Sequence, residues 1–445
     1  MSQSERKRST VRHTRAIQRD RTKRPNGVPP AEAIAARLTE IIQPATMEVV
    51  SQFHAKGLRE RTLNLPVMMA VLLSAVWRQV NGIMDLSRLI QTEVLLWAQP
   101  IKVSQQALSQ RLSSLPAELF LEVLEKVLPL MHIRWVERSR PLPPEIEWAQ
   151  AHYTQVCICD GSTLDSLIRK LKVLRDLPKH PLAGRMTALL DMGSRLPIHI
   201  WYTPDSSAHD QTFWAHIVSK VKAGALLVFD LGYTNFAHFA QLSARQITFL
   251  TRAKSNLSYQ LIHRLHTSAA LHDSIVWIGS DKDGTRQQIR LIEVLYRGLW
   301  YRYLTNELDD TRLPTDIAVA LYWQRWRIED AYAIVKRLLG LAYFWCADDN
   351  AIRLQLWATW LLYATLVDLT DAVAQHLHCP FAALSMEMVY RSLYYFTQAH
   401  HRGDLDAADP IVYLCNHAKL FGLIKRKPIL SKLNLPPSPT LTLIL

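Results

Sequence analysis

The sequence has few of the features that mark secreted, membrane-spanning or disulfide-stabilised proteins. Its five cysteines form an odd, scattered set without the spacing of zinc ligands. Its longest apolar runs, residues 65–77 and 356–367, are shorter than the ~20 residues that a membrane-spanning helix requires. The N-terminus has no apolar stretch of the signal-peptide type. These absences predict a reduced, cytoplasmic protein without membrane association, disulfides or a structural metal, whose two apolar runs form core helices.

Acidic residues are also in short supply. The chain has 39 Asp and Glu against 52 Lys and Arg, which gives a formal net charge of +13. Such an excess favours an anionic polymer as partner, with DNA or RNA ahead of a membrane surface. The length of 445 residues exceeds one ordinary core and predicts about three domains.

The N-terminal third divides into two parts. Residues 1–28 carry nine basic side chains and almost no apolar ones, which predicts a disordered basic arm. This arm either solubilises the protein or contacts DNA. Residues 29–145 have repeated apolar spacings of three and four, which predict a helical DNA-binding domain. Within it, residues 103–116 with Ser104 as N-cap form either part of a helix-turn-helix or a plain capped surface helix.

The pattern of the next region, residues 146–250, indicates a sheet. TQVCICD, residues 154–160, predicts a buried strand that ends at Asp160, and residues 185–191 and 197–203 predict a hairpin. Asp210 is positioned to cap a helix that leads into a second buried strand, which ends at Asp230. Together these elements predict an α/β fold with a mixed sheet covered by helices.

The rest of the chain is predicted to complete this core. Residues 251–314 alternate strongly between apolar and polar side chains and predict a mainly β insertion. Residues 315–375 return to helix and form the second part of the core. Residues 376–445 predict a C-terminal helical region that ends in a loose tail.

The stretch YWQRWRIEDAYAIVK, residues 322–336, raises the first functional hypothesis. Tyr322, Arg325, Glu329 and Lys336 are spaced 3, 4 and 7 apart, so a helix would carry them on one stripe about 21 Å long. Arg325 and Glu329 can form an ordinary ion pair one helical turn apart. Alternatively, the stripe contributes Glu329 to an acidic site and gives Tyr322, Arg325 and Lys336 to successive phosphates.

Two buried strands that end in Asp160 and Asp230 would bring both carboxylates to one rim of the sheet, and Glu329 lies on a helix long enough to reach it. Three converging carboxylates repel one another unless cations neutralise them. Their hard oxygens select Mg²⁺ or Mn²⁺, and two such ions would form a clamp for displacement at phosphorus. Taken singly, each of these Asp residues at a strand end before a Gly is better interpreted as a turn residue, and only their combination favours a metal site.

These residues resemble the IS-four family of DDE transposases, which are bacterial insertion-sequence enzymes marked by a Y-R-E-K signature. The resemblance rests on DGS at 160–162, DLGY at 230–233, the four residues of the stripe, TRAKSN at 251–256 and YLTNE at 303–307. It extends from about residue 60 to 370, and it is looser in the N-terminal arm and the last 70 residues.

The resemblance implies an RNase H-like core in which Asp160, Asp230 and Glu329 are the catalytic, metal-binding triad. It implies cut-and-paste movement of an element through a DNA hairpin, by a homodimer in a synaptic complex with inverted-repeat and target DNA at the bacterial nucleoid. In such enzymes one aromatic side chain follows the signature Arg and another belongs to the insertion. Trp326 matches the first, and either Trp300 or Tyr301 matches the second as a base-flipping residue. Arg252 and Lys254, within TRAKSN, are further predicted DNA contacts.

Two other hypotheses remain open from the sequence. A DNA-binding protein of transposase descent could act without catalysis as a repressor or architectural factor. A metal-dependent DNA nuclease could cut without joining ends. The presence of all three acids and of the stripe favours the active transposase over the first alternative.

Overall fold

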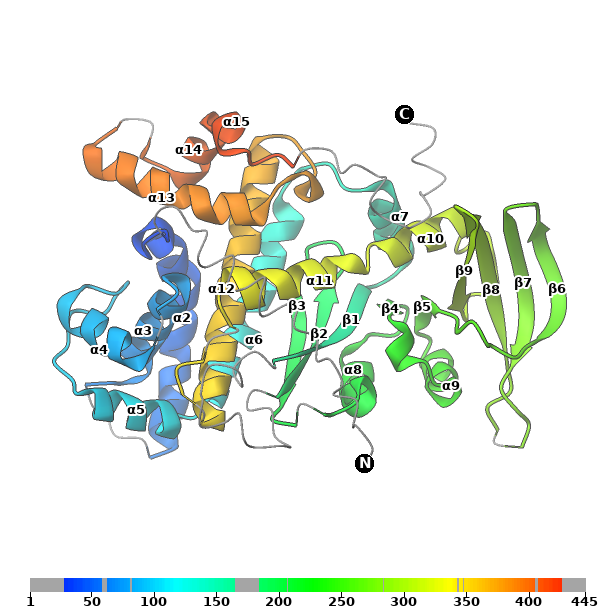
Figure 1. Ribbon diagram of the computed structural model, residues 1–445, viewed down its shortest axis with the longest axis horizontal. Helices are drawn as coiled ribbons and strands as arrows, with labels where there is room; N and C mark the ends of the chain where they lie inside the picture. The colour runs from blue at the N-terminus through cyan, green and yellow to red at the C-terminus, as the bar shows by residue number, and fades with distance from the viewer. Residues whose placement is uncertain are drawn as a thin grey trace, which may run out of the picture.

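The computed structural model describes residues 28–57, 62–80, 82–164, 184–205, 207–282, 284–341, 344–346, 348–404 and 407–425. Within them, a nine-stranded mixed sheet lies on one side of the molecule and helices from both ends of the chain lie on the other (Figure 1). The predicted α/β fold class with flanking helical regions is confirmed. Residues 1–27 of the predicted basic arm and residues 426–445 of the predicted tail lie outside the described residues.

Five strands form the RNase H-like part of the sheet, in the order β3-β2-β1-β4-β5. The first three pair in antiparallel fashion, whereas β4 and β5 run parallel to β1. Their bounds are β1 Val156–Thr163, β2 Arg185–Asp191, β3 Pro197–Thr203, β4 Leu226–Phe229 and β5 Thr248–Arg252. The hairpin predicted at residues 185–191 and 197–203 coincides with β2 and β3.

Four antiparallel strands extend the same sheet in the order β9-β8-β7-β6, and β9 pairs with β5. They are β6 Gln260–Thr267, β7 Leu271–Ile278, β8 Gln287–Tyr296 and β9 Leu299–Thr305. The segment predicted as a β insertion therefore continues the core sheet and does not form a second sheet. Its limits, like those of the other predicted domains, stay predictions.

The two faces of the sheet carry different apolar cores, because successive side chains of a strand point to opposite faces. On β1, Val156 and Ile158 belong to the larger core, which includes the long C-terminal helices. Cys157 and Cys159 belong to the smaller core, together with α8 (Trp214–Lys220) and α9 (Phe236–Ala244). Burial raises the pKa of both thiols well above the usual range, and all five cysteines are free.

The helical layer is built around α12, Asp349–His376, which is buried along almost its whole length. It contacts α3, α5 and α6 from the N-terminal region and α13 and α14 from the C-terminal region. Helices far apart in the sequence thus share one core. The N-terminal helices are α2 Glu32–Ala55, α3 Leu65–Trp77, α4 Ile83–Thr92, α5 Gln105–Ser114, α6 Glu118–Glu137 and α7 Pro144–His152. The C-terminal ones are α13 Met386–Arg402, α14 Pro410–Asn416 and α15 Ala418–Phe421.

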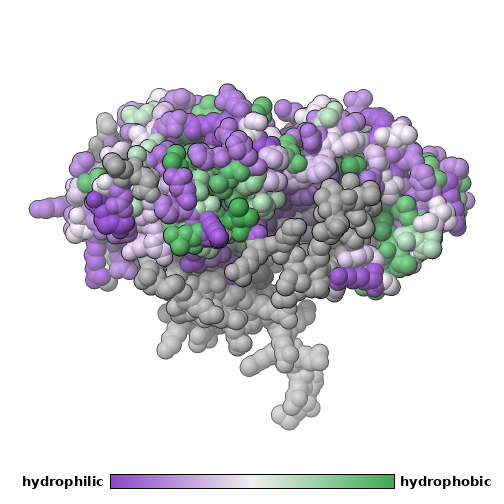
Figure 2. All heavy atoms as spheres, turned by 90° about the horizontal axis from the view of Figure 1, so that it is seen from above, coloured by the Kyte–Doolittle hydropathy of each residue, from purple (hydrophilic) through white to green (hydrophobic). Residues whose placement is uncertain are grey.

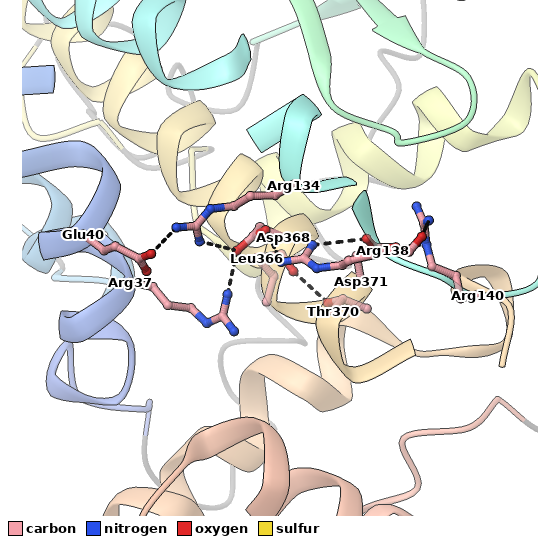
Figure 3. Close-up of polar contacts among 9 residues, drawn as sticks. All are labelled: Arg37, Glu40, Arg134, Arg138, Arg140, Leu366, Asp368, Thr370 and Asp371. Atoms are coloured by element: carbon pink, nitrogen blue, oxygen red, sulfur yellow. Dashed lines mark hydrogen bonds and ion pairs between the residues drawn. The ribbon is translucent and has the colours of Figure 1, made fainter. Parts of the chain in front are cut away.

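A network of ion pairs joins α2, α6 and α12 (Figure 3). Asp368 and Asp371 of α12 are its centre, and only 1% of each side chain is exposed. Asp368 accepts hydrogen bonds from Arg37 at 2.6 Å and from Arg138 at 2.5 Å. Asp371 accepts from Arg138 at 3.1 Å and from Arg140 at 2.7 Å. Arg134 adds a longer contact of 3.8 Å to Asp368. Arginines thus surround both aspartates.

The surface seen from above is mostly hydrophilic, with hydrophobic residues in separate patches (Figure 2). Exposed large apolar side chains of the C-terminal helices include Tyr395, Val412 and Leu420. The two apolar runs predicted as core helices lie within α3 and α12, and both are buried. Among the described residues, none of the helices is both long and apolar enough to traverse a membrane.

Candidate active site

Asp160 and Asp230 lie side by side at the point where the parallel pairing of β1 and β4 ends. The last residues paired between these strands are Cys159 and Phe229, and the two aspartates come next. Alternation directs Asp160 to the face of Ile158, which packs in the larger core. One expectation was wrong: β1 does not end at Asp160, because its pairing with β2 continues to Thr163. The end of the shorter strand β4 is what brings Asp160 to a rim.

The helix predicted to carry the whole stripe is broken in the structure. It consists of α10 Thr315–Trp323, α11 Trp326–Ala333 and a π-helical turn Ile334–Leu338. At the break, Gln324 donates to Glu145 of α7. Arg327 donates to Gln324 Oε1 at 2.5 Å and to the Met192 carbonyl at 2.5 Å. The backbone N–H groups of Arg325, Arg327 and Ile328 donate to the carbonyls three residues before them, in place of the regular bonds to the fourth. The side-chain contacts of Gln324 and Arg327 accompany this tighter turn.

Arg325 lies between two of the three predicted catalytic carboxylates, and its contact with Glu329 is the ion pair one helical turn apart that the spacing allowed. Its guanidinium donates to Asp160 Oδ2 at 3.1 Å and to Glu329 Oε1 at 3.4 Å. Only 7% of the Arg325 side chain is exposed, against 45% for Glu329. Tyr322 donates from its hydroxyl to Asp230 Oδ1 at 3.3 Å. Asp160, Asp230 and Glu329 therefore meet around a single arginine and a single phenol.

The electrostatics of the site reflect its excess of carboxylates. The pKa of Asp160 is raised to about 6, first because the side chain is buried and also because Asp230 and Glu329 are near. Arg325 and the Gly161 N–H, which donates to Asp160 Oδ1 at 2.8 Å, act in the opposite direction. Burial alone would lower the pKa of Arg325, but Tyr322 and the surrounding carboxylates raise it. The site thus favours positive charge.

The donor set suits a hard divalent cation, since it consists of carboxylate oxygens. No three Asp, Glu, His or Cys side chains in the described part of the chain are arranged to hold a metal ion together. The Arg325 guanidinium lies between Asp160 and Glu329, donates to both and supplies positive charge there. The residues therefore fit Mg²⁺ or Mn²⁺ chemically, with Arg325 as the cation among them.

The other predicted DNA-binding residues are spread around this site. Trp326 begins α11 and is 46% exposed, and Arg325 lies 5.2 Å from its ring centroid. Lys336 belongs to the π-helical turn, where its ammonium lies 5.9 Å from the Tyr332 ring centroid. Arg252 ends β5 and lies 5.8 Å from the Tyr301 ring centroid. Lys254 is exposed in the loop after β5.

The two candidate base-flipping residues point to opposite faces of β9. Tyr301 lies on the same face as Tyr303, whose ring contacts Tyr322 at 5.0 Å between centroids. Tyr301 is 9% exposed. Trp300 is 41% exposed and stacks on His272 on the other face. Tyr301 therefore lies on the side of the acidic site but is buried, whereas Trp300 is exposed but lies on the opposite face of the sheet.

Tyr332 is a further residue of the site that the sequence pattern did not indicate. Its hydroxyl donates to the Asp160 carbonyl at 2.6 Å and accepts from the Ala188 N–H at 3.0 Å. One side chain of α11 thus joins the backbones of β1 and β2 beside Asp160. A periodicity in the sequence cannot show which backbone groups a tyrosine hydroxyl reaches.

Comparison with known proteins associates this region with DNA transposition. Residues 179–365 match the model of a family described as the transposase DDE domain. The match includes Asp230 and Glu329, and Asp160 precedes its first residue. A protein of Sinorhizobium fredii (strain NBRC 101917 / NGR234) named "Putative transposase y4zB" is 26% identical over 188 residues. That alignment covers 38% of this chain and 52% of the relative, so this chain spans about half the length of the curated relative that it matches.

Proposed function

We propose that this chain is a DDE transposase of the IS-four type, which excises a DNA element and joins it to target DNA by a cut-and-paste route. The observation that carries the proposal is the convergence of Asp160, Asp230 and Glu329 on Arg325 at the rim of an RNase H-like sheet. The match to the transposase DDE domain supports the same function.

Asp160, Asp230 and Glu329 would hold two Mg²⁺ or Mn²⁺ ions. When bound, such ions lower the pKa of an attacking water or 3′-hydroxyl and stabilise the leaving oxygen at phosphorus. Tyr322 keeps Asp230 oriented through its hydroxyl hydrogen bond. Arg325 bridges Asp160 and Glu329, and its guanidinium would contact a phosphate of the DNA once the carboxylates hold cations.

The remaining basic and aromatic side chains would position the DNA. Lys336, Arg252 and Lys254 give positive charge to phosphates on either side of the cleaved bond. A hairpin intermediate requires a base to leave the helical stack, and stacking on an aromatic ring offsets part of that cost. Trp326 suits this role because it is exposed beside Arg325. The burial of Tyr301 and the orientation of Trp300 mean that either would have to move to act as a second wedge.

The test is cleavage of labelled DNA that carries the ends of the element, in the presence of Mg²⁺. Asp160→Asn, Asp230→Asn and Glu329→Gln should each reduce the rate by roughly 10³-fold or more, while binding to the ends and the far-UV spectrum are retained. Asp330→Asn is the matched control, because Asp330 is an exposed carboxylate next to Glu329. Normal cleavage by all three variants would refute the assignment.

The same assay separates the alternatives. End binding without cleavage by the unmodified chain would indicate a DNA-binding protein of transposase descent. Cleavage that never produces hairpins or joined ends would indicate a nuclease. Sedimentation of the complex with end DNA tests the homodimer, which the resemblance implies for a synaptic complex.

A further inference from the structure

Glycines follow both aspartates of the site, and neither is required by its backbone conformation. Gly161 directly follows Asp160, and Gly232 follows Asp230 by two residues. Neither has a positive φ, in contrast to Gly184 or Gly224. A turn that only glycine can form is therefore not the reason for their presence. The remaining reason is close approach by another group.

One carboxylate occupies the space beside both glycines. A Cβ on Gly161 would lie 2.5 Å from Asp210 Oδ1, and a Cβ on Gly232 would lie 2.7 Å from Asp210 Oδ2. Both distances are well inside normal van der Waals separation. Asp210 was expected to cap a helix, but it is the first residue of a 3₁₀ turn, Asp210–Phe213, whose N-cap residue is His209. Its carboxylate bridges the segments that carry Asp160 and Asp230.

Arg185 holds Asp210 in this position. It is the first residue of β2, and its guanidinium donates to Asp210 Oδ1. The same guanidinium lies against Gly161, where Nη2 would be 3.0 Å and Nε 3.2 Å from an added Cβ. Gln211 adds a hydrogen bond of 3.3 Å to the Gly232 carbonyl. The Arg185 charge neutralises Asp210, so Asp210 adds little repulsion to the acidic site.

The pair supports the site from the opposite face of the sheet. Gly161 faces away from the Asp160 side chain, because neighbouring residues of a strand alternate. Leu189, which has the same parity as Arg185 on β2, belongs to the smaller core. The Asp210 carboxylate therefore lies on the other side of the sheet from Asp160, Asp230 and Glu329. It contacts the segments that carry Asp160 and Asp230 at the backbone of Gly161 and Gly232.

We propose that Asp210, held by Arg185, is a positioning residue that sets the separation of Asp160 and Asp230 by filling the space at Gly161 and Gly232. This proposal rests on the proposed function, in which the two aspartates hold divalent cations together. It assigns the glycines of DGS and DLGY a common physical role. A substitution at Asp210 or at either glycine should therefore change the affinity for divalent cations more than it changes the stability of the fold.

The experiment titrates the full-length protein with Mn²⁺ and measures free Mn²⁺ by electron paramagnetic resonance, alongside the midpoint of thermal unfolding. Gly161→Ala should weaken Mn²⁺ binding by about tenfold or more, the size seen when groups that orient metal ligands are altered. Asp210→Asn, which keeps the shape but loses the charge held by Arg185, should weaken it less. Gly82→Ala is the control, since a Cβ there meets nothing within 4 Å and φ is not positive.

The decisive variant is the double substitution Gly161→Ala with Asp210→Ala. Removing the carboxylate makes room for the new methyl group, so the double variant should bind Mn²⁺ better than Gly161→Ala alone. No recovery, or unchanged affinity in both Gly161→Ala and Asp210→Asn, overturns the positioning role. The variant Asp160→Asn distinguishes the two proposals: if it binds Mn²⁺ normally, the proposed metal site is wrong, whatever Asp210 does.

Discussion

The two acid clusters of this protein differ in their ratio of arginines to carboxylates. On α12, Asp368 and Asp371 contact four guanidinium groups, those of Arg37, Arg134, Arg138 and Arg140. At the rim of the sheet, Asp160, Asp230 and Glu329 surround one, that of Arg325, among the described residues. A cluster with more cations than acids is complete and ties helices together. A cluster with fewer leaves negative charge for cations from solution to neutralise.

The largest expected effect on stability is at the complete cluster. Asp368→Asn removes the charge that Arg37 and Arg138 share and takes from Arg37 the carboxylate that it contacts among the described residues. This should lower the free energy of unfolding by roughly 3–5 kcal/mol. Urea unfolding measures the change. Glu40→Gln is the control, because the pair of Glu40 with Arg134 is exposed and should contribute below about 1 kcal/mol. A small loss in Asp368→Asn would contradict the assignment of this cluster as a structural tie.

At the rim of the sheet, removing the charge of an acid should raise the free energy of unfolding instead of lowering it. The folded pKa of Asp160 is about 6, above its ordinary value of 3.8, so between these pH values the folded chain binds more protons than the unfolded chain. Stability therefore falls as pH rises through 6. In chelator, Asp160→Asn should be more stable than the unmodified chain above pH 6, by on the order of 2 kcal/mol, and the difference should vanish as pH falls toward 4. Melting curves from pH 4 to 8 measure it. If Asp160→Asn is less stable than the unmodified chain at pH 7, the proposed difference between the two acid clusters is wrong.

A smaller effect is expected from Tyr332→Phe. The rim of the sheet has few arginines, and hydrogen bonds between neutral groups hold its backbone. This substitution removes the two that the Tyr332 hydroxyl makes. The free energy of unfolding should fall by about 1.5 kcal/mol, with a loss of cleavage rate. Urea unfolding and the cleavage assay measure the two changes. Tyr395→Phe, at an exposed tyrosine, should change neither.

The smallest effect is expected at a cation that belongs to neither cluster. Lys254→Ala should leave the free energy of unfolding within about 0.5 kcal/mol, because Lys254 is exposed. If Lys254 contacts a phosphate, DNA binding should weaken and the slope of log affinity against log salt should decrease by about 1. An unchanged slope would remove Lys254 from the DNA interface. Lys126→Ala, at a lysine paired with Glu48 on the helical layer, is the control.

Many of the strands could be predicted from the sequence, because apolar runs, alternation and turn residues are local patterns. Residues 154–160 and 225–230 were predicted as buried strands that each end in Asp, which placed both carboxylates at one rim of the sheet. The structure adds that the two strands are parallel neighbours. The alternating segments of residues 251–314 likewise corresponded to strands. These predictions required no knowledge of which distant side chains meet.

The remaining features depend on contacts between residues far apart in the chain. The helix break at Gln324 is held by Glu145 and by Arg327 bound to the Met192 carbonyl, which helical spacing does not encode. Asp210 had the sequence context of a cap, and its role beside Gly161 emerged only from the fold. The buried Asp368 and Asp371 follow an apolar run, where a sequence pattern would place solvent-exposed turns of helix.

The position of the acidic rim within the nine-stranded sheet has a consequence for dynamics. β1 and β4 are inner strands, whereas β3 and β6 are the edges. Opening of such a sheet begins at edges with few covering groups, and β6 is exposed along nearly its whole length. Backbone amides beside Asp160 and Asp230 should therefore exchange with deuterium among the slowest in the sheet and those of β6 among the fastest. Asp160 and Asp230 would keep their separation while the edge strand β6 opens.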